Sequence, residues 1–321
     1  MRTRTKVWLI IAASLVLIGC ILFAGVMSKL KWDFTKLSTV KYEMNAYEIS
    51  EAFDDISINT DTADITFMLS NDENCRVECH AEEREKHLVT VKDHTLVIEA
   101  TPRDNWYDYI GISFGESRIT VYLPKTEYAS LSINESTGDI EIPKDFIFNG
   151  VDIALSTGNV NFCASASETV KIKTSTGNIC VEDISAGALD LSVTTGKVTV
   201  SDVSCDGDVT VGVSTGKTYL TDTRCKSIIS SGNTGDIYLD NVIATDKISI
   251  ERSTGDVKFD SSDAAEIFVQ TDTGDVTGSL LTDKVFITQT GTGDVDVPKT
   301  MDGGRCEIIT DTGDIKITIK L

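Results

Sequence analysis

The chain has 321 residues and a formal net charge of −21, from 50 acidic and 29 basic residues. A surface this acidic argues against nucleic acid as a partner, and equally against unaided binding to anionic polymers or lipid headgroups. Cations, cationic peptides and neutral glycans remain as partners that the charge allows.

The N-terminus is predicted to be a short tail followed by a membrane anchor. Residues 1–6 are basic, and residues 7–27 form an apolar run long enough to cross a bilayer as a helix. A cleavable signal usually has a shorter apolar core and a small-residue cleavage site, so an uncleaved anchor is favoured. Leu17-Ile18-Gly19-Cys20 offers an alternative, a lipoprotein anchored at Cys20, although lipoproteins usually turn polar after that cysteine.

Residues 1–6 are predicted to be a cytoplasmic tail, with the rest of the chain outside the membrane. Basic residues lie on both sides of the apolar run, so the positive-inside rule hardly distinguishes the two orientations of the helix in the membrane. A basic tail before the first apolar segment resembles an export signal, and long domains translocate largely regardless of charge. Residues 28–50 show little periodicity and are predicted to be a stalk.

Residues 51–321 are predicted to be one repeat domain. It begins at Asp61-Thr62-Ala63-Asp64-Ile65, which reads as a degenerate repeat with alanine at the glycine position. Residues 71–124 break the period. We expect them to form an irregular cap containing a hairpin, because an uncapped first repeat would expose its core and its strand edges.

Four aromatic residues gather inside this cap, in a chain that is only 7% aromatic. They are Trp106, Tyr107, Tyr109 and Phe114. One interpretation is packing over the end of the repeat domain. The alternative is an exposed contact patch, because Tyr and Trp combine an apolar face with a polar group and are favoured at binding sites.

The main feature of the sequence is a Thr-Gly dipeptide that recurs every 19 or 20 residues. Such a constant period predicts a solenoid, in which each repeat, or rung, buries its apolar face against the next. Each rung is named below by its glycine. The glycines are Gly138, Gly158, Gly177, Gly196, Gly216, Gly235, Gly255, Gly274, Gly293 and Gly313.

Short strands are predicted on both sides of each Thr-Gly. Apolar residues stand two and four residues after the glycine, as in Ile140 and Ile142, and also seven and five residues before it, as in Leu131 and Ile133. This alternation is typical of half-buried strands. A weaker apolar position further on indicates a poorly formed third side. The sequence therefore predicts an all-β, parallel β-solenoid, with regular rungs over residues 125–321.

The Thr-Gly motif is predicted to be a structural turn. Glycine supplies a positive φ, and the following Asp or Asn can bond nearby backbone amides. The sharper alternative is a calcium ladder, because carboxylates on successive rungs would stack. Asn and Lys take the same position in earlier rungs, which argues against it. The candidate metal ligands are Asp236, Asp256, Asp275, Asp294 and Asp314.

Two of the eight cysteines are candidates for a disulfide. Cys205 and Cys225 each stand nine residues after their rung's glycine. Equivalent positions on adjacent rungs lie about 5 Å apart, within the range for a disulfide. Free buried thiols are the alternative.

The Ser-Thr-Gly-Asp-Ile/Val rungs, the degenerate repeat at residues 61–65 and the single N-terminal anchor resemble the bacterial putative-adhesin family of β-strand repeats, a domain of unknown function. The resemblance covers residues 48–321. It implies a membrane-associated envelope protein, and some relatives accompany systems that respond to envelope stress or antimicrobial peptides. It transfers no catalytic residue. Lys197, Lys217 and Thr290-Gly291-Thr292-Gly293 depart from a uniform aspartate ladder.

Three classes of function are consistent with these features. The favoured one is a non-enzymatic surface scaffold or adhesin, with no cofactor. The second is an ectodomain that responds to envelope stress or antimicrobial peptides through a membrane-protein partner, since a six-residue tail cannot signal. The third is a polysaccharide-active enzyme. It is disfavoured because glycosidases need two distinct carboxylates across a cleft, and the turn aspartates simply recur.

The C-terminal rung is a candidate for self-association. It ends in the alternating residues Ile315, Ile317, Ile319 and Leu321, which would leave an apolar strand edge open at the end of the solenoid. Such an edge can pair with another copy of the chain.

Overall fold

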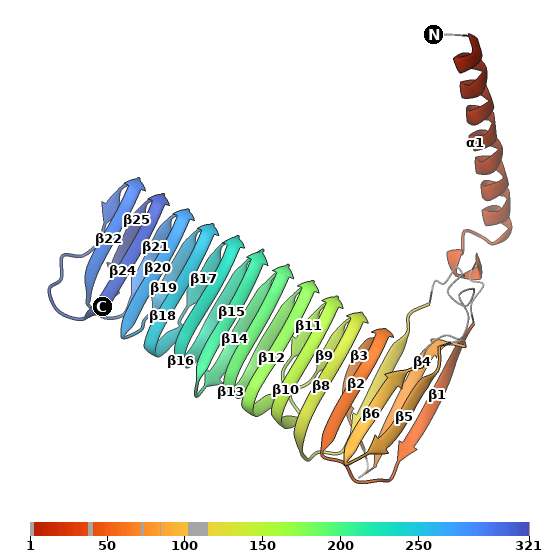
Figure 1. Cartoon of the computed structure of the whole chain (residues 1–321), viewed down its shortest axis with the longest axis horizontal. Coiled ribbons are helices and arrows are strands. Elements are labelled where there is room, and N and C mark those ends of the chain that lie inside the picture. Colours follow the sequence, from red (N-terminus) through yellow and green to blue (C-terminus); the bar gives the residue numbers. More distant parts are fainter. Residues whose placement is uncertain (1–2, 38–40, 72–73, 84, 102–114, 321) are drawn as a thin grey trace.

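The structure, a computed structural model, describes residues 3–37, 41–71, 74–83, 85–101 and 115–320. It confirms the predicted β-solenoid: within these described residues, 25 strands form one continuous sheet that winds into a rod. Figure 1 shows the rungs side by side along the rod, with the N-terminal helix extending from one end.

The N-terminal segment forms helix α1, Thr3–Lys29, followed by a short 3₁₀ helix η1, Phe34–Leu37. Part of the predicted stalk is instead folded into the solenoid. Strand β1, Tyr42–Ile49, pairs antiparallel with β4, Cys75–Glu82. Tyr47 and Ile49, two residues apart on β1, both pack against the core. This alternation is too short to identify a strand from the sequence.

A β-hairpin lies within the region predicted to be the cap, at the α1 end of the solenoid (Figure 1). Strands β5, His87–Lys92, and β6, Thr95–Ala100, pair antiparallel around Asp93 and His94, both of which have positive φ. Two consecutive positive φ values are the signature of the tight turn that matches strand twist. Strand β4 also pairs antiparallel with β7, Arg118–Leu123. Antiparallel strands therefore cover the first parallel rung.

The degenerate repeat is a true rung, placed between the cap and the regular repeats. Its strands are β2, Asp55–Thr62, and β3, Asp64–Leu69. Strand β2 pairs in parallel with β6 on one side and with β8 on the other, with Thr62 opposite Thr137. Ala63 lacks the positive φ of the repeat glycines, so alanine fits there without strain.

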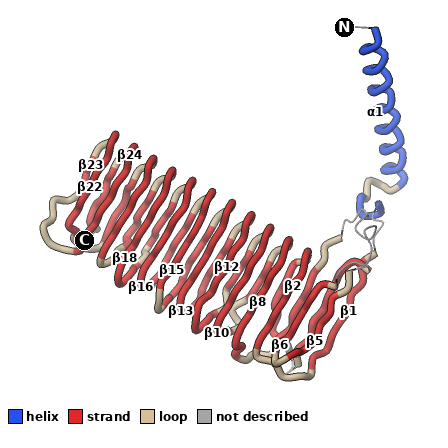
Figure 2. The backbone as a smooth tube through the Cα atoms, viewed as in Figure 1, coloured by secondary structure: helices blue, strands red, loops and turns tan. Residues whose placement is uncertain are grey.

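The regular rungs stack in parallel and in register. Figure 2 shows their strands side by side along the rod. Their strands are β8 Glu127–Thr137, β9 Ile140–Ile142, β10 Ile147–Thr157, β11 Val160–Phe162, β12 Ser165–Thr176, β13 Ile179–Thr195, β14 Val198–Cys205, β15 Asp208–Thr215, β16 Thr218–Thr234, β17 Ile237–Asp240, β18 Ile243–Thr254, β19 Val257–Ser262, β20 Glu266–Thr273, β21 Val276–Leu280, β22 Lys284–Thr292, β23 Val295–Asp296, β24 Gly304–Thr312 and β25 Ile315–Ile319.

The core runs through the rod as stacked columns of apolar side chains. In the rungs from Gly138 to Gly255, the residues two and four positions after the glycine, such as Val198 and Val200, are fully buried. Each such side chain contributes about 1.5–3 kcal/mol by leaving water. The third side also contributes, because Ile184, Val203 and Val242 are buried. It begins at a second corner, where one polar residue per rung has positive φ: Asp183, Asp202, Asp222, Asn241 and Ser261.

The last two rungs stand in the reverse of their sequence order. Strand β24 pairs with β20 on one side and β22 on the other, and β25 likewise lies between β21 and β23. The C-terminal rung is thus second from the end, with Ile315 and Ile317 buried. The C-terminal rung, the candidate for self-association, is therefore covered on both sides, and the open edge belongs to β22 and β23.

Burial explains this exchange. The β24 strand presents Cys306 and Ile308 to the core, whereas β22 presents Phe286 and Thr288 at the equivalent register. The more apolar rung takes the position covered on both sides. Gly303 and Gly304 let the chain return, since a Cβ on either would lie 1.9 Å from a backbone oxygen.

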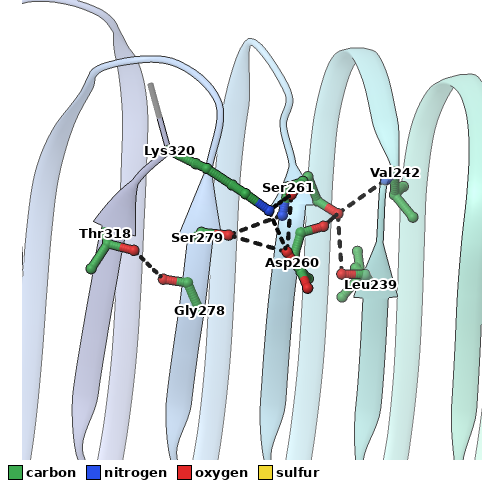
Figure 3. A network of polar contacts seen from close by, with 9 residues as sticks. Leu239, Val242, Asp260, Ser261, Gly278, Ser279, Thr318 and Lys320 are labelled. Atoms are coloured by element: carbon green, nitrogen blue, oxygen red, sulfur yellow. Dashed lines mark hydrogen bonds and ion pairs between the residues drawn. The ribbon is translucent and has the colours of Figure 1, made fainter.

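The end of the chain is also tied back to earlier rungs. Lys320 Nζ donates to Ser261 Oγ at 2.7 Å and reaches Asp260 Oδ1 at 3.4 Å, as Figure 3 shows. In the same view, Thr318 Oγ1 donates to the backbone oxygen of Gly278 at 3.2 Å.

Candidate functional site

The Thr-Gly turns form one edge of the rod, and two separate features of the backbone there require glycine. All ten have φ between 130° and 155°. A Cβ at Gly196 would also lie 1.7 Å from the backbone oxygen of Gly177, and the other rungs are as tight. The rungs therefore approach so closely at this edge that no side chain fits, which accounts for the ten glycines as structural residues.

The polar residue after each glycine bonds the neighbouring rung. The backbone N–H of Asp256 donates to Asp236 Oδ1 at 3.2 Å, and that of Asp275 donates to Asp256 Oδ1 at 2.9 Å. Asn159 accepts in the same way from the backbone of Asn178, so Asp and Asn are interchangeable here. The spatial order continues from Asp275 to Asp314 and then Asp294, because the last rungs are exchanged.

This ladder uses one side-chain oxygen per rung as a backbone acceptor, which is a structural role. Within the described residues, no group of three or more His, Cys, Asp or Glu side chains is arranged to hold a metal ion. The calcium interpretation thus gains no support from the geometry.

The candidate disulfide pair lies where the sequence places it but is not bonded. Ser204 pairs with Arg224, so Cys205 and Cys225 follow in register on neighbouring rungs. Both are buried free thiols in the structure. Burial raises the pKa of Cys225 to about 12, which suppresses the thiolate that disulfide formation requires.

The aromatic cluster of Trp106, Tyr107, Tyr109 and Phe114 lies outside the described residues. Its two interpretations, packing or contact, therefore both remain predictions.

A different aromatic group stands on the outer face of the middle rungs. We name Lys197, Lys217, Tyr219, Asp236 and Tyr238 the Lys–Tyr patch. The rings of Tyr219 and Tyr238 stack on adjacent strands β16 and β17, with centroids 4.9 Å apart and planes 5° apart. Lys197 Nζ lies 5.9 Å from the Tyr219 ring centroid, and Lys217 Nζ lies 5.7 Å from that of Tyr238.

Polar contacts fix the arrangement of the patch. Lys217 Nζ pairs with Asp236 Oδ2 at 2.9 Å, and the Tyr238 hydroxyl donates to the same oxygen at 3.2 Å. The hydrogen bond to Asp236 raises the pKa of Lys217, and the same contact lowers the pKa of Asp236. Lys217 therefore keeps its positive charge on an otherwise acidic rod, beside half-buried aromatic faces.

Such an arrangement can bind a partner by stacking and by charge. Tyrosines offer apolar faces with little conformational freedom to lose, and cations beside aromatic rings are held in place by the ring quadrupole. In the sequence, Lys197 and Lys217 stand out only as departures from the aspartate ladder. The pattern that would have revealed the patch is a Lys one residue after Gly196 and Gly216, combined with a Tyr three residues after Gly216 and Gly235.

The fold and its surface define a parallel β-solenoid rod with an apolar N-terminal helix. The family model described as Toastrack DUF4097 matches residues 53–217 and 204–321. These matches cover most of the chain, so the protein belongs to this Toastrack family, whose function is unknown.

Solved structures with similar architecture share little sequence with the chain. A protein from Parabacteroides distasonis described as a putative lipid binding protein is 15% identical, with 86% of this chain and 97% of that chain covered and a TM-score of 0.45. A putative adhesin from Bacteroides fragilis is 16% identical, with 87% and 97% covered and a TM-score of 0.43. No curated protein matches the sequence.

Proposed function

We propose that α1 anchors the protein in the cell membrane and that the solenoid stands outside the cell as a surface scaffold or adhesin. The exposure of α1 carries this proposal. Thr5–Lys29 contains an 18-residue stretch with a mean hydropathy of 2.8, and none of that stretch is covered by the rest of the described chain. An apolar surface of this size needs an apolar surrounding, and a bilayer supplies one.

The dimensions of α1 support a span. At 1.5 Å per residue the apolar run of residues 7–27 is about 32 Å long, enough to cross a hydrocarbon core of ~30 Å. Exposed Trp8 and Trp32 lie near its two ends, where indole rings favour the membrane interface. The helix also continues without interruption beyond Cys20, which favours a span over lipoprotein processing.

Cysteine labelling in intact cells tests the anchor and its orientation together. Met301 is 94% exposed at the far end of the rod, so Met301→Cys offers a reactive thiol there. We expect a membrane-impermeant maleimide to label it in intact cells. Both variants are made with Cys163 and Cys180 replaced by Ser, because those native free thiols are partly exposed on the solenoid. The matched Thr3→Cys variant should then react only after permeabilisation. Labelling of Thr3→Cys alone in intact cells, or release of the protein by alkaline carbonate, would contradict the proposal.

The Lys–Tyr patch is the contact surface that we assign to the scaffold. At about 4.8 Å per rung it stands ~30 Å beyond the cap, well clear of a membrane at the α1 end. Tyr219→Thr with Tyr238→Thr should weaken attachment of cells without destabilising the rod, because Thr199 and Thr277 stand at the same outward position in other rungs. The paired control is Lys171→Ser with Lys173→Ser, two exposed lysines away from the patch. Equal attachment by both double variants would refute this assignment.

A second candidate function, collection of cationic peptides, is favoured by the carboxylates along the Thr-Gly edge. Asp256 and Asp275 each commit one oxygen to a backbone contact and Asp294 ends the ladder, so these three exposed residues leave carboxylate oxygen available. Replacing Asp256 and Asp275 by Asn keeps the acceptor and removes the charge. Titration with a polylysine peptide should then show weaker, less salt-dependent binding. Unchanged binding would argue against this function.

We also propose self-association through the open edge of β22 and β23. Val285, Ile287 and Val295 are each more than one-third exposed there. An uncovered strand with apolar side chains can pair with a second copy.

A further inference from the structure

A charged residue stands at an inward position in the middle of the rod. The residue three positions before each glycine faces the core, as Leu155, Val193 and Val213 do. In the Gly255 rung this residue is Arg252, and its side chain is buried, with only 4% of the residue exposed.

The surrounding rungs change to accommodate its guanidinium. Ser230 and Thr218 occupy core positions that are apolar in neighbouring rungs, and both accept hydrogen bonds from Arg252 Nη2, at 2.9 and 3.2 Å. Gly232 leaves the space that the guanidinium fills, since a Cβ there would lie 1.8 Å from Arg252 Nη1. Substitutions on three consecutive rungs thus combine into one polar chamber.

The chamber lacks a negative charge for this cation. Among the described residues Arg252 forms no ion pair with a carboxylate, and its Nε is buried and donates to no acceptor. Burial alone lowers the pKa of Arg252, to about 10. A buried, unpaired charge lowers the stability of the fold by several kcal/mol. Its presence here therefore indicates that the charge has a function.

A surface hollow of about 470 Å³ lies over this chamber, and Arg252 and Gly232 form part of its wall. The exposed side chains around it supply hydroxyls, amides and carboxylates, from Ser231, Asn233, Ser253, Gln270, Glu251 and Asp272. The volume is in the range of sites for small ligands. Hydroxyl, amide and carboxylate groups in one hollow suit a ligand with many hydroxyls, because they both donate and accept.

We propose that this hollow binds a carboxylate-bearing sugar of an otherwise neutral glycan. The sugar carboxylate pairs with the Arg252 guanidinium, and the surrounding side chains bond the sugar hydroxyls. One buried cation suits one carboxylate. The acidic rod and the two carboxylates beside the hollow repel a polyanion, which excludes a nucleic acid or a densely charged polymer. This site is separate from the Lys–Tyr patch and does not depend on the membrane anchor.

Binding of sialyllactose and lactose to the full-length protein in detergent tests the proposal. The two ligands differ by one carboxylate-bearing sugar. We expect saturation-transfer NMR and calorimetry to detect sialyllactose, and to show lactose binding at least about tenfold more weakly, because a charge-assisted hydrogen bond contributes about 1.5–3 kcal/mol. Equal binding of both ligands, or binding of neither, would overturn the proposal. Equal binding of a glutamate tripeptide would show that the site reads any carboxylate rather than a sugar, and would also overturn it.

Variants locate the site. Arg252→Met should remove sialyllactose binding, whereas Arg224→Met, which removes an exposed arginine elsewhere, should leave it unchanged. Because Arg252→Met alters the core, Asn233→Ala with Ser253→Ala provides a second test on exposed residues only. This double variant should weaken sialyllactose at least about threefold. Unchanged binding in both the folded Arg252→Met variant and the double variant would refute the assignment.

Discussion

Glu135 makes the junction between the degenerate rung and the Gly138 rung sensitive to pH. It occupies the same inward position as Arg252 and is 2% exposed. The Thr60 hydroxyl donates to one carboxylate oxygen, and the Ala63 backbone N–H donates to the other at 3.1 Å. Burial raises the pKa of Glu135 to about 7 from 4.5, although these hydrogen bonds oppose the shift.

The sign of the effect follows from this raised pKa. The folded protein holds a proton on Glu135 that the unfolded chain has lost once the pH exceeds about 4.5. The stabilisation is therefore complete below that pH and is lost as the pH rises to about 7. A shift of about 2.5 pH units corresponds to about 3 kcal/mol. Glu135→Gln, which stays neutral and keeps an acceptor, should remove this dependence.

Hydrogen exchange measures this effect locally, because solenoid rungs open with unequal free energies. Protection of amides in β2 and β8 should fall between pH 4.5 and 7 relative to amides of the Gly216 rung in the same molecule. The relative protection should stay constant in Glu135→Gln. The same decline in both proteins, or a rise in the wild type, would refute the reasoning.

Three further predictions concern the turns, the open edge and the thiols. Gly196→Ala should destabilise the protein by about 2–5 kcal/mol in urea unfolding, because φ would be strained and a Cβ has no space. The control Ala63→Gly should lower stability by about 1 kcal/mol or less. Equal effects of the two substitutions would contradict the close approach of the rungs at the turn edge. Ile287→Lys should reduce self-association in light scattering of the detergent-solubilised protein at high concentration, and a wild type that stays monomeric there would refute pairing through β22. Cys225 should resist iodoacetamide at pH 8 until the protein unfolds, because its thiol pKa is raised to about 12; rapid alkylation, or a disulfide to Cys205 in non-reducing mass spectrometry, would show the reverse.

The sequence by itself determined the rung. A strand, a tight turn and a second strand are encoded locally, by the apolar alternation around each Thr-Gly and by the glycine that the turn requires. Because neighbouring rungs repeat the same pattern, their parallel stacking in register follows directly. The same logic identified the degenerate rung at Ala63, even though its partner strand β8 lies 75 residues further along at the pair Thr62–Thr137.

Only the tertiary structure decided which rung lies next to which at the ends of the rod. Every rung can pair with every other through its backbone, so the order of the rungs depends on which arrangement buries the more apolar residues. The exchange of the last two rungs places Ile315 in the core and leaves Val295 at the exposed edge. The Lys–Tyr patch and the Arg252 chamber arise in the same way. Their residues are separated by one or two periods in the sequence and become neighbours only because consecutive rungs stack about 4.8 Å apart.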